Sequence, residues 1–189
     1  MRARFRARRA AVPGRAAVDA AIVAHVLALP EVGAARVVLA FWPLLGRGEV
    51  DVRPLVAALV ARGAVLALPV VVAGAAPRLA ARRFTSEAAL VPGPWGLLEP
   101  APDAEPVAAD TVDVVVVPAL ALGRDGSRLG YGGGYYDAFL PTTRALRLGV
   151  VPQRCLVDAL PTEAHDACLD VVVTERGAVR VGREARGPA

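Results

Sequence analysis

The sequence contains no lysine, since all 22 of its basic residues are arginine. Any task that lysine performs in other proteins therefore falls here to arginine or to backbone N–H groups. Cysteine is scarce as well, and two cysteines in 189 residues exclude a disulfide framework. Charged residues make up only 21% of the chain against 55% hydrophobic residues, a balance that excludes intrinsic disorder and predicts a compact core.

Long apolar runs are also missing. The longest uncharged apolar stretch, residues 63–77, has fifteen residues and is broken by Pro69 and Gly74, which is too short for a transmembrane helix. The basic N-terminus followed by apolar residues shares some features with a signal peptide, but Asp19 and His25 interrupt it and no clean cleavage site follows. We expect a cytoplasmic protein that does not bind membranes.

The positive charge is concentrated at the start of the chain. Six arginines lie within the first fifteen residues without an acidic residue among them, so the remainder carries −2 although the whole chain carries +4. A basic arm over residues 1–14 can bind nucleic acid, a membrane surface or a phosphate group. Because no aromatic-rich basic patch occurs elsewhere, we expect a solvated helix face or a phosphate-facing arm, and no nucleic-acid partner. A nucleic-acid-binding protein that uses this arm is the alternative.

The two cysteines flank a histidine, in the order Cys155, His165 and Cys168. A metal site would need further ligands at the usual spacing, and a Cys–His nucleophile would need close approach of the two side chains. We therefore expect both cysteines to be buried or unreactive thiols.

Strand and helix patterns alternate along the chain. Helices are predicted over residues 15–29 and 51–62, and a helical turn over 156–160. Buried strands are predicted over residues 37–42, 64–72, 112–117, 146–151 and 170–174, and a more exposed strand over 79–84. A long proline-rich crossing is expected over 90–106, and a frayed tail over 182–189.

This alternation predicts a single α/β domain, residues 1–189, with a mainly parallel sheet covered by helices on both faces. In such sheets ligands bind at the carboxyl ends of the strands. We therefore expect the loops after Trp42, after Pro118 and around Asp170 to converge.

The most informative stretch is residues 114–140, where a valine-rich central strand is followed by a glycine-rich loop and the start of a helix. Glycines permit positive φ and close backbone approach, and free N–H groups at a helix start can face an anion. The stretch is neither a P-loop nor a Rossmann fingerprint, because its spacing fits neither. Spacing alone leaves a phosphate site and a merely tight turn equally open.

Residues 126–137, GSRLGYGGGYYD, resemble the signature of the 5-formyltetrahydrofolate cyclo-ligase family, G-x-R-x-G-x-G-[KG]-G-[FY]-Y-D, which follows a hydrophobic strand that ends in proline. Weaker likenesses follow the family order. They are RRAA at 8–11, GEVD at 48–51, WGLLEP at 95–100, and HD at 165–166 with the strand at 169–174.

The resemblance implies a cytoplasmic ligase of folate and one-carbon metabolism. Its reaction is the ATP-dependent cyclisation of 5-formyltetrahydrofolate to 5,10-methenyltetrahydrofolate through a phosphorylated formyl intermediate. ATP and Mg²⁺ are the implied cofactors, small molecules the implied partners, and a monomer the expected state. A non-catalytic folate- or nucleotide-binding relative with a regulatory role is the alternative.

The resemblance also implies roles for individual residues. Arg128 is the implied catalytic residue, and Asp137 and Asp170 are the implied Mg²⁺ ligands. The implied nucleotide-binding residues are Arg128, Leu129, Gly130, Tyr131, Gly132, Gly133, Gly134, Tyr135 and Tyr136. The implied substrate-binding residues are Glu49, Leu44 and Trp95, with Phe41 and Trp42 as further aromatic candidates.

Each charged residue of this set also has a purely structural interpretation. Arg128 could brace the turn, Asp137 could be a first-turn helix acid, and Asp170 a solvated charge at a strand edge. The chain also departs from the family pattern, because Gly133 stands where lysine is common and the N-terminal lysine that meets ATP would fall before Met1. We expect either a later start than in the family or an arginine of the arm in that role.

Overall fold

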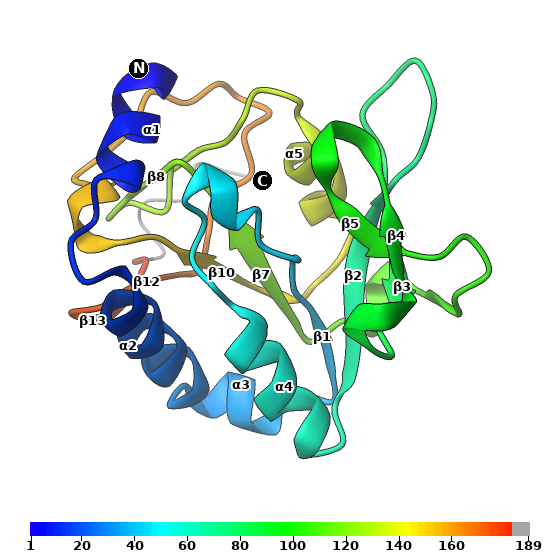
Figure 1. Ribbon diagram of the computed structural model, residues 1–189. Helices are drawn as coiled ribbons and strands as arrows, with labels where there is room; N and C mark the ends of the chain where they lie inside the picture. Colours follow the sequence, from blue (N-terminus) through cyan, green and yellow to red (C-terminus); the bar gives the residue numbers. More distant parts are fainter. Residues whose placement is uncertain (183–189) are drawn as a thin grey trace.

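The computed structural model describes residues 1–182 and has an eight-stranded mixed sheet at its centre. Its strands follow the order β13-β12-β10-β7-β1-β2-β3-β6. The five strands from β12 to β2 are parallel, whereas β13, β3 and β6 are antiparallel to their neighbours. The α/β class and the mostly parallel sheet predicted from the sequence are confirmed, and β7, which precedes the glycine loop, lies in the interior of the sheet (Figure 1).

The main sheet consists of β1 (Val37–Leu39), β2 (Val65–Val71), β3 (Leu79–Arg83), β6 (Pro106–Val107), β7 (Val114–Pro118), β10 (Leu146–Val150), β12 (Val171–Thr174) and β13 (Gly177–Arg180). A three-stranded sheet contains β8 (Ala121–Gly123), β9 (Arg128–Leu129) and β11 (Leu156–Val157), and a hairpin contains β4 (Leu90–Pro92) and β5 (Leu98–Pro100). The helices are α1 (Arg2–Ala10), α2 (Arg15–Leu27), α3 (Pro30–Ala34), α4 (Arg53–Ala61) and α5 (Tyr135–Phe139). Short 3₁₀ turns are η1 (Leu45–Arg47), η2 (Glu87–Ala89), η3 (Pro94–Gly96), η4 (Ala109–Thr111), η5 (Leu140–Thr142) and η6 (Gln153–Cys155).

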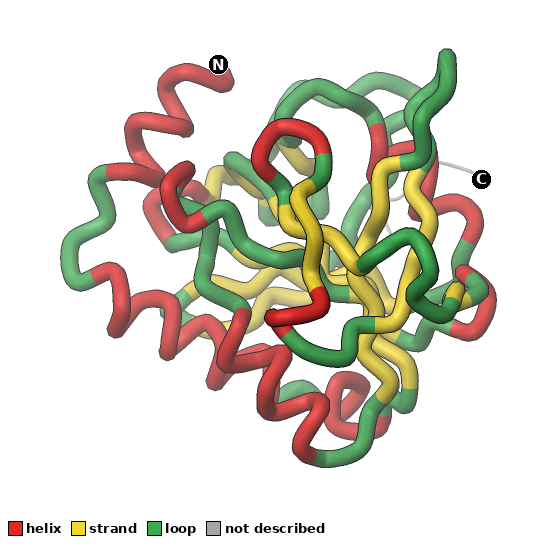
Figure 2. Tube along the Cα trace, turned by 45° about the vertical axis from the view of Figure 1, so that its right-hand side comes forward, coloured by secondary structure: helices red, strands yellow, loops and turns green. Residues whose placement is uncertain are grey.

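Both faces of the main sheet are buried, but they are covered differently. Helices α2, α3 and α4 pack on one face, against Val114 and Val116 of β7. Helices α1 and α5 and the small strands cover the other, where Val115 and Val117 point. Figure 2 shows the α2–α4 layer along one side of the strands. Because alternate strand residues point to opposite faces, the continuous valine run of β7 follows from this double burial.

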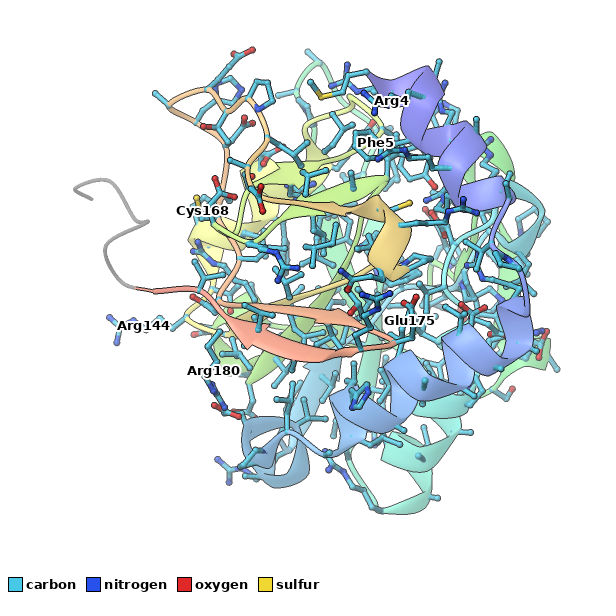
Figure 3. All side chains as sticks on the ribbon, turned by 90° about the vertical axis from the view of Figure 1, so that its left-hand side faces the viewer. Arg4, Phe5, Arg144, Cys168, Glu175 and Arg180 are labelled. Atoms are coloured by element: carbon cyan, nitrogen blue, oxygen red, sulfur yellow. The ribbon has the colours of Figure 1, made fainter. Side chains whose placement is uncertain are left out.

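The N-terminal arm is a helix docked on the body of the protein. Phe5 of α1 is 5% exposed and belongs to the core on the α1 side, whereas Arg4 is on the solvent side (Figure 3). Arg9, one turn after Phe5, is 1% exposed. Residues at i and i+4 share one face of a helix, so α1 buries a stripe that contains a cation. The basic arm over 1–14 is therefore not an entirely solvated face.

Several local expectations were wrong. Residues 90–100 of the proline-rich stretch form the β4–β5 hairpin, and only residues 101–105, before β6, are irregular. Residues 156–160 begin with strand β11 rather than a helical turn. Strand β13 extends the sheet edge beyond β12 and was not predicted. Of the tail expected to fray, residue 182 is exposed and residues 183–189 lie outside the described residues.

Within residues 1–182, no single helix is long and apolar enough to span a membrane. The consecutive helices α1 and α2 meet that length and composition only together, and they are bent by 104° at their break.

We predict that Gly126→Ala destabilises the protein. Gly126 has a φ of +86°, and a Cβ atom there would lie 2.7 Å from the Leu169 carbonyl oxygen, so both backbone strain and a backbone clash arise. The expected loss is about 1–3 kcal/mol of unfolding free energy, measured by urea denaturation. The matched control is Gly33→Ala in α3, where nothing lies within 4 Å of the new methyl group and stability is expected to stay equal or rise. Equal stabilities of the two variants would contradict the prediction.

Candidate functional site

Three segments that are far apart in the sequence meet beyond the carboxyl ends of β1 and β7. They are the segment after β1 with Glu49, the glycine loop at 130–134, and the tip of the β4–β5 hairpin with Trp95. The Tyr131 hydroxyl donates a hydrogen bond of 2.5 Å to Glu49, and Arg47 Nη2 donates one of 2.9 Å to the Trp95 carbonyl. The rings of Trp95 and Tyr135 meet edge to face at 5.6 Å. The expected convergence of the loops after Trp42 and after Pro118 is confirmed.

The glycine loop is exposed, and its conformation requires glycine at two positions. Gly132 has a φ of +101° and Gly134 a φ of +68°, a region that other residues rarely adopt. Arg2 of α1 reaches this loop, since its Nε donates to the Gly130 carbonyl at 3.1 Å and its guanidinium lies beside Gly132. Helix α5, which follows, has only five residues. The helix dipole therefore contributes little, and the loop amides and arginines are the main groups able to bind an anion here.

Arg128 and Asp137, both predicted from the signature, lie against each other. Arg128 Nη2 donates to Asp137 Oδ1 at 2.6 Å, and the arginine side chain is only 6% exposed. The same carboxylate oxygen accepts the Ala167 N–H at 3.2 Å. Arg128 therefore braces the loop through Asp137, and Asp137 is an acidic residue in the first turn of α5. The structural interpretation of each residue is thus correct in part.

Two buried polar atoms have no hydrogen-bond partner among the described residues. They are Nε of Arg128 itself and the hydroxyl of Tyr136. The Arg128 guanidinium carbon lies 5.8 Å from the centre of the Tyr136 ring. Burial raises the pKa of Tyr136 well above its ordinary value, so its hydroxyl stays protonated. These two donors without partners, on neighbouring side chains, fit an oxygen-rich ligand, because buried donors left without partners are costly.

Glu49 is buried, and protein donors hold both of its carboxylate oxygens. Leu44 N–H donates to Oε2 at 2.7 Å, while the Tyr131 hydroxyl donates to Oε1. Burial, followed by the negative charge of Glu49, raises the pKa of Tyr131 to about 12. The phenol is therefore neutral and able to donate at ordinary pH. Leu44 and Glu49, both predicted to bind substrate, are brought together.

Arg9 is part of this assembly and was missed as a site residue. Its Nη2 donates to the Tyr131 hydroxyl at 2.7 Å and to the Arg47 carbonyl at 2.6 Å, and its Nη1 donates to the Ala119 carbonyl at 3.2 Å. The guanidinium also lies 5.3 Å from the centre of the Tyr131 ring. The helical spacing of Phe5 and Arg9 was the signal that could have identified Arg9 as buried.

The aromatic candidates have different environments. Trp95 is 57% exposed at the hairpin tip and has a φ of +56°, which is rare for a residue with a side chain. Phe41 is 4% exposed within the core, and Trp42 stacks on Phe84 with a ring distance of 5.4 Å. Of the three, Trp95 has the ring surface free to contact a ligand, while Phe41 has the structural role.

Asp170 lies at the amino end of β12, not at the carboxyl edge where we expected it. Its Oδ2 accepts the Arg147 N–H at 2.8 Å, at the amino end of the neighbouring β10. Asp137 instead contacts the segment before Asp170, through Ala167. Within residues 1–182 no three His, Cys, Asp or Glu side chains gather as a metal cluster. Cys155 is buried and free, and His165 faces Glu163 at 3.7 Å.

The fold and the site define this chain as a mostly parallel α/β protein with an arginine-bearing glycine loop beyond a central strand. The model of the 5-formyltetrahydrofolate cyclo-ligase family matches residues 1–175. The chain therefore belongs to that family, as the GSRLGYGGGYYD motif indicated.

Individual relatives agree with this assignment. The 5-formyltetrahydrofolate cyclo-ligase of Mycolicibacterium smegmatis is 43% identical over 96 residues, which cover 48% of each chain. The chain thus spans about half the length of this relative, and 44% of that of Saccharomyces cerevisiae. The Escherichia coli K12 enzyme is 33% identical over 131 residues, 67% of this chain and 72% of the relative. The NMR structure of the 5,10-methenyltetrahydrofolate synthetase of Aquifex aeolicus has a TM-score of 0.81 and 29% identity, with 100% of this chain and 94% of that chain covered.

We predict an alkaline loss of stability that depends on Tyr131. Its pKa rises from 10.0 to about 12 on folding, so between these values the unfolded chain has released the proton that the folded protein still holds. This contribution is complete below pH 10 and is lost as the pH approaches 12. Unfolding free energies from denaturant titrations at stepped pH should fall less steeply for Tyr131→Phe than for the wild type, and identical slopes would contradict the prediction.

Proposed function

We propose that this chain catalyses the ATP-dependent cyclisation of 5-formyltetrahydrofolate to 5,10-methenyltetrahydrofolate. The observation that carries the proposal is the juxtaposition of the exposed glycine loop, the Arg128–Asp137 pair with its unsatisfied donors, and Glu49. Membership of the cyclo-ligase family supports it. Domain extent, a monomeric state and a cytoplasmic location remain predictions from the sequence.

The chemistry needs an activated oxygen, because a formyl amide oxygen is a poor leaving group. Transfer of the γ-phosphoryl group of ATP to that oxygen releases ADP and forms an imino-phosphate. The N10 nitrogen then attacks the formyl carbon and closes the five-membered ring, N10 gives up its proton, and the carbon–oxygen bond breaks to release phosphate. The protein has to align the three reacting groups, neutralise charge and exclude water.

The residues of the site suit these tasks. Amides of the loop from Gly130 to Gly134 would bind the phosphates, and Tyr135 and Tyr136 would enclose the nucleotide. Leu129 is the last residue of β9, the strand that leads into the loop. Arg128 would neutralise the charge that spreads over the transferring group. Glu49, Leu44 and Trp95 would bind the folate, with the Trp95 ring as a stacking surface.

Asp137 fits a Mg²⁺ ligand, since its carboxylate oxygens are the donors that this ion prefers and lie at the loop. The ion would supply additional positive charge at the phosphates. Asp170 remains the proposed second ligand, although its carboxylate is engaged with the Arg147 amide at the opposite end of the strands.

The direct test is incubation of the protein with ATP, Mg²⁺ and 5-formyltetrahydrofolate while the methenyl chromophore is followed by absorbance. ATP-dependent appearance of the chromophore is expected. Binding of both ligands without any turnover would favour the non-catalytic relative instead.

Arg128→Ala is expected to lower turnover by roughly 100-fold or more while ATP affinity changes only a few-fold, because a fixed cation matters most when charge moves in the transition state. Arg128→Lys should rescue only partly, since an ammonium cannot reproduce the planar guanidinium. Single-turnover methenyl formation and equilibrium ATP binding are the measurements. Arg124→Ala, an exposed arginine paired with Asp158, is the control and should behave as wild type. If Arg128→Ala weakens ATP binding as much as it slows the chemical step, Arg128 is a binding residue only.

The metal proposal predicts that Asp137→Asn raises the Mg²⁺ concentration needed for half-maximal turnover, because the amide loses the negative charge that attracts the ion. Asp170→Asn should act likewise if both aspartates bind the ion. Mg²⁺ titrations of turnover measure both effects. A change for Asp137→Asn alone would remove Asp170 from the site, and no change in either variant would refute the metal proposal.

A further inference from the structure

One side chain joins the two halves of the proposed site. Tyr131 lies between Gly130 and Gly132 in the loop proposed to bind phosphates, yet its hydroxyl donates to Glu49, the residue proposed to bind folate. The two residues are 82 positions apart and come from loops after different strands. A displacement of the loop at Tyr131 therefore acts directly on the Glu49 carboxylate.

The hydroxyl has a defined position because Arg9 holds it from the other side. The carbonyls of Arg47 and Ala119 hold the Arg9 guanidinium in place. Its Nη2 therefore donates to the Tyr131 oxygen from a fixed position. The pKa of Tyr131, raised to about 12, keeps the phenol protonated and able to donate to Glu49 while it accepts from Arg9. Since the Leu44 amide holds the second oxygen of Glu49, the carboxylate is restrained at both oxygens.

We propose that Tyr131 is a positioning residue that orients Glu49 for folate and transmits the position of the glycine loop to the folate site. This inference rests on the proposed function, because it requires that the loop binds nucleotide and that Glu49 binds folate. It adds that nucleotide and folate affinities are coupled through the Arg9–Tyr131–Glu49 contacts.

Coupling between two sites is reciprocal, so bound nucleotide changes folate affinity by the same factor as bound folate changes nucleotide affinity. Tyr131→Phe keeps the ring over Arg9 but removes the hydroxyl that reaches Glu49. It should therefore abolish the coupling while leaving the loop backbone in place.

The experiment is calorimetric titration of 5-formyltetrahydrofolate into the full chain, with and without a non-hydrolysable ATP analogue and Mg²⁺. For Tyr131→Phe we expect folate affinity to fall by about tenfold, as for the loss of a hydrogen bond to a charged group. Affinity for the analogue alone should stay within about twofold of wild type, because Tyr131→Phe keeps every backbone amide of the loop proposed to bind the phosphates. The ratio of folate affinities with and without the analogue should fall from its wild-type value to near one.

Thr111→Val is the matched control, since it also removes one hydroxyl, which donates to the Ala108 carbonyl at the amino end of β7. It should bind both ligands as wild type does. Arg9→Lys should shift folate affinity in the same direction as Tyr131→Phe. Denaturant unfolding of each variant is the check that it is folded.

Unchanged folate affinity in Tyr131→Phe would overturn the positioning role. Equal weakening of both ligands would show a general distortion of the loop and overturn it as well, and an unchanged affinity ratio would overturn the transmission. If the wild-type chain binds no folate at all, the proposed function falls together with this inference, a result distinct from the others.

Discussion

A buried guanidinium connects the elements of the site. Arg9 is 1% exposed, and four of its hydrogen bonds reach segments 38, 110 and 122 residues away. A buried cation is costly unless its donors are satisfied. No carboxylate pairs with Arg9 directly among the described hydrogen bonds; backbone carbonyls and the Tyr131 hydroxyl satisfy it. The N-terminal helix, the loop after β1 and the glycine loop are therefore constrained together.

The same constraint explains why a chain without lysine can build this site. Arginine has more N–H donors than lysine in a fixed planar arrangement, so Arg9 bonds two carbonyls and the Tyr131 hydroxyl at once. Arg128 bonds Asp137 through Nη2, and its Nε stays without a protein partner within residues 1–182. Arg2 extends this pattern, because it reaches the Gly130 carbonyl from the exposed end of α1. Arg2 and Arg9 of the N-terminal arm thus contact the glycine loop, while Arg4 is exposed to solvent.

The wrong expectations have identifiable physical causes. Proline was taken as a sign of irregular structure over residues 90–106, but Pro92 and Pro100 terminate the short strands of a two-stranded hairpin, where a missing N–H is tolerated. Asp170 was placed on the ligand side because it flanks a strand. Asp170 in fact begins the strand predicted over 170–174, and in a parallel sheet the first residue of a strand lies at the amino edge, away from the ligand side, so the direction of the chain already contradicted that placement. The loop was taken as continuous, although β8 and β9 form a hairpin within it.

The sequence by itself determined the α/β class, the buried valine strands, the glycine loop with Arg128 and Asp137, and the family. These are local properties, since periodicity, β-branched runs and a motif of twelve residues are all readable within a short window. The tertiary structure decided the contacts of Arg9, Tyr131 and Glu49. Such contacts depend on strand order and on packing across 82 and 122 residues of sequence, and no local pattern encodes the direction in which a side chain meets a distant partner.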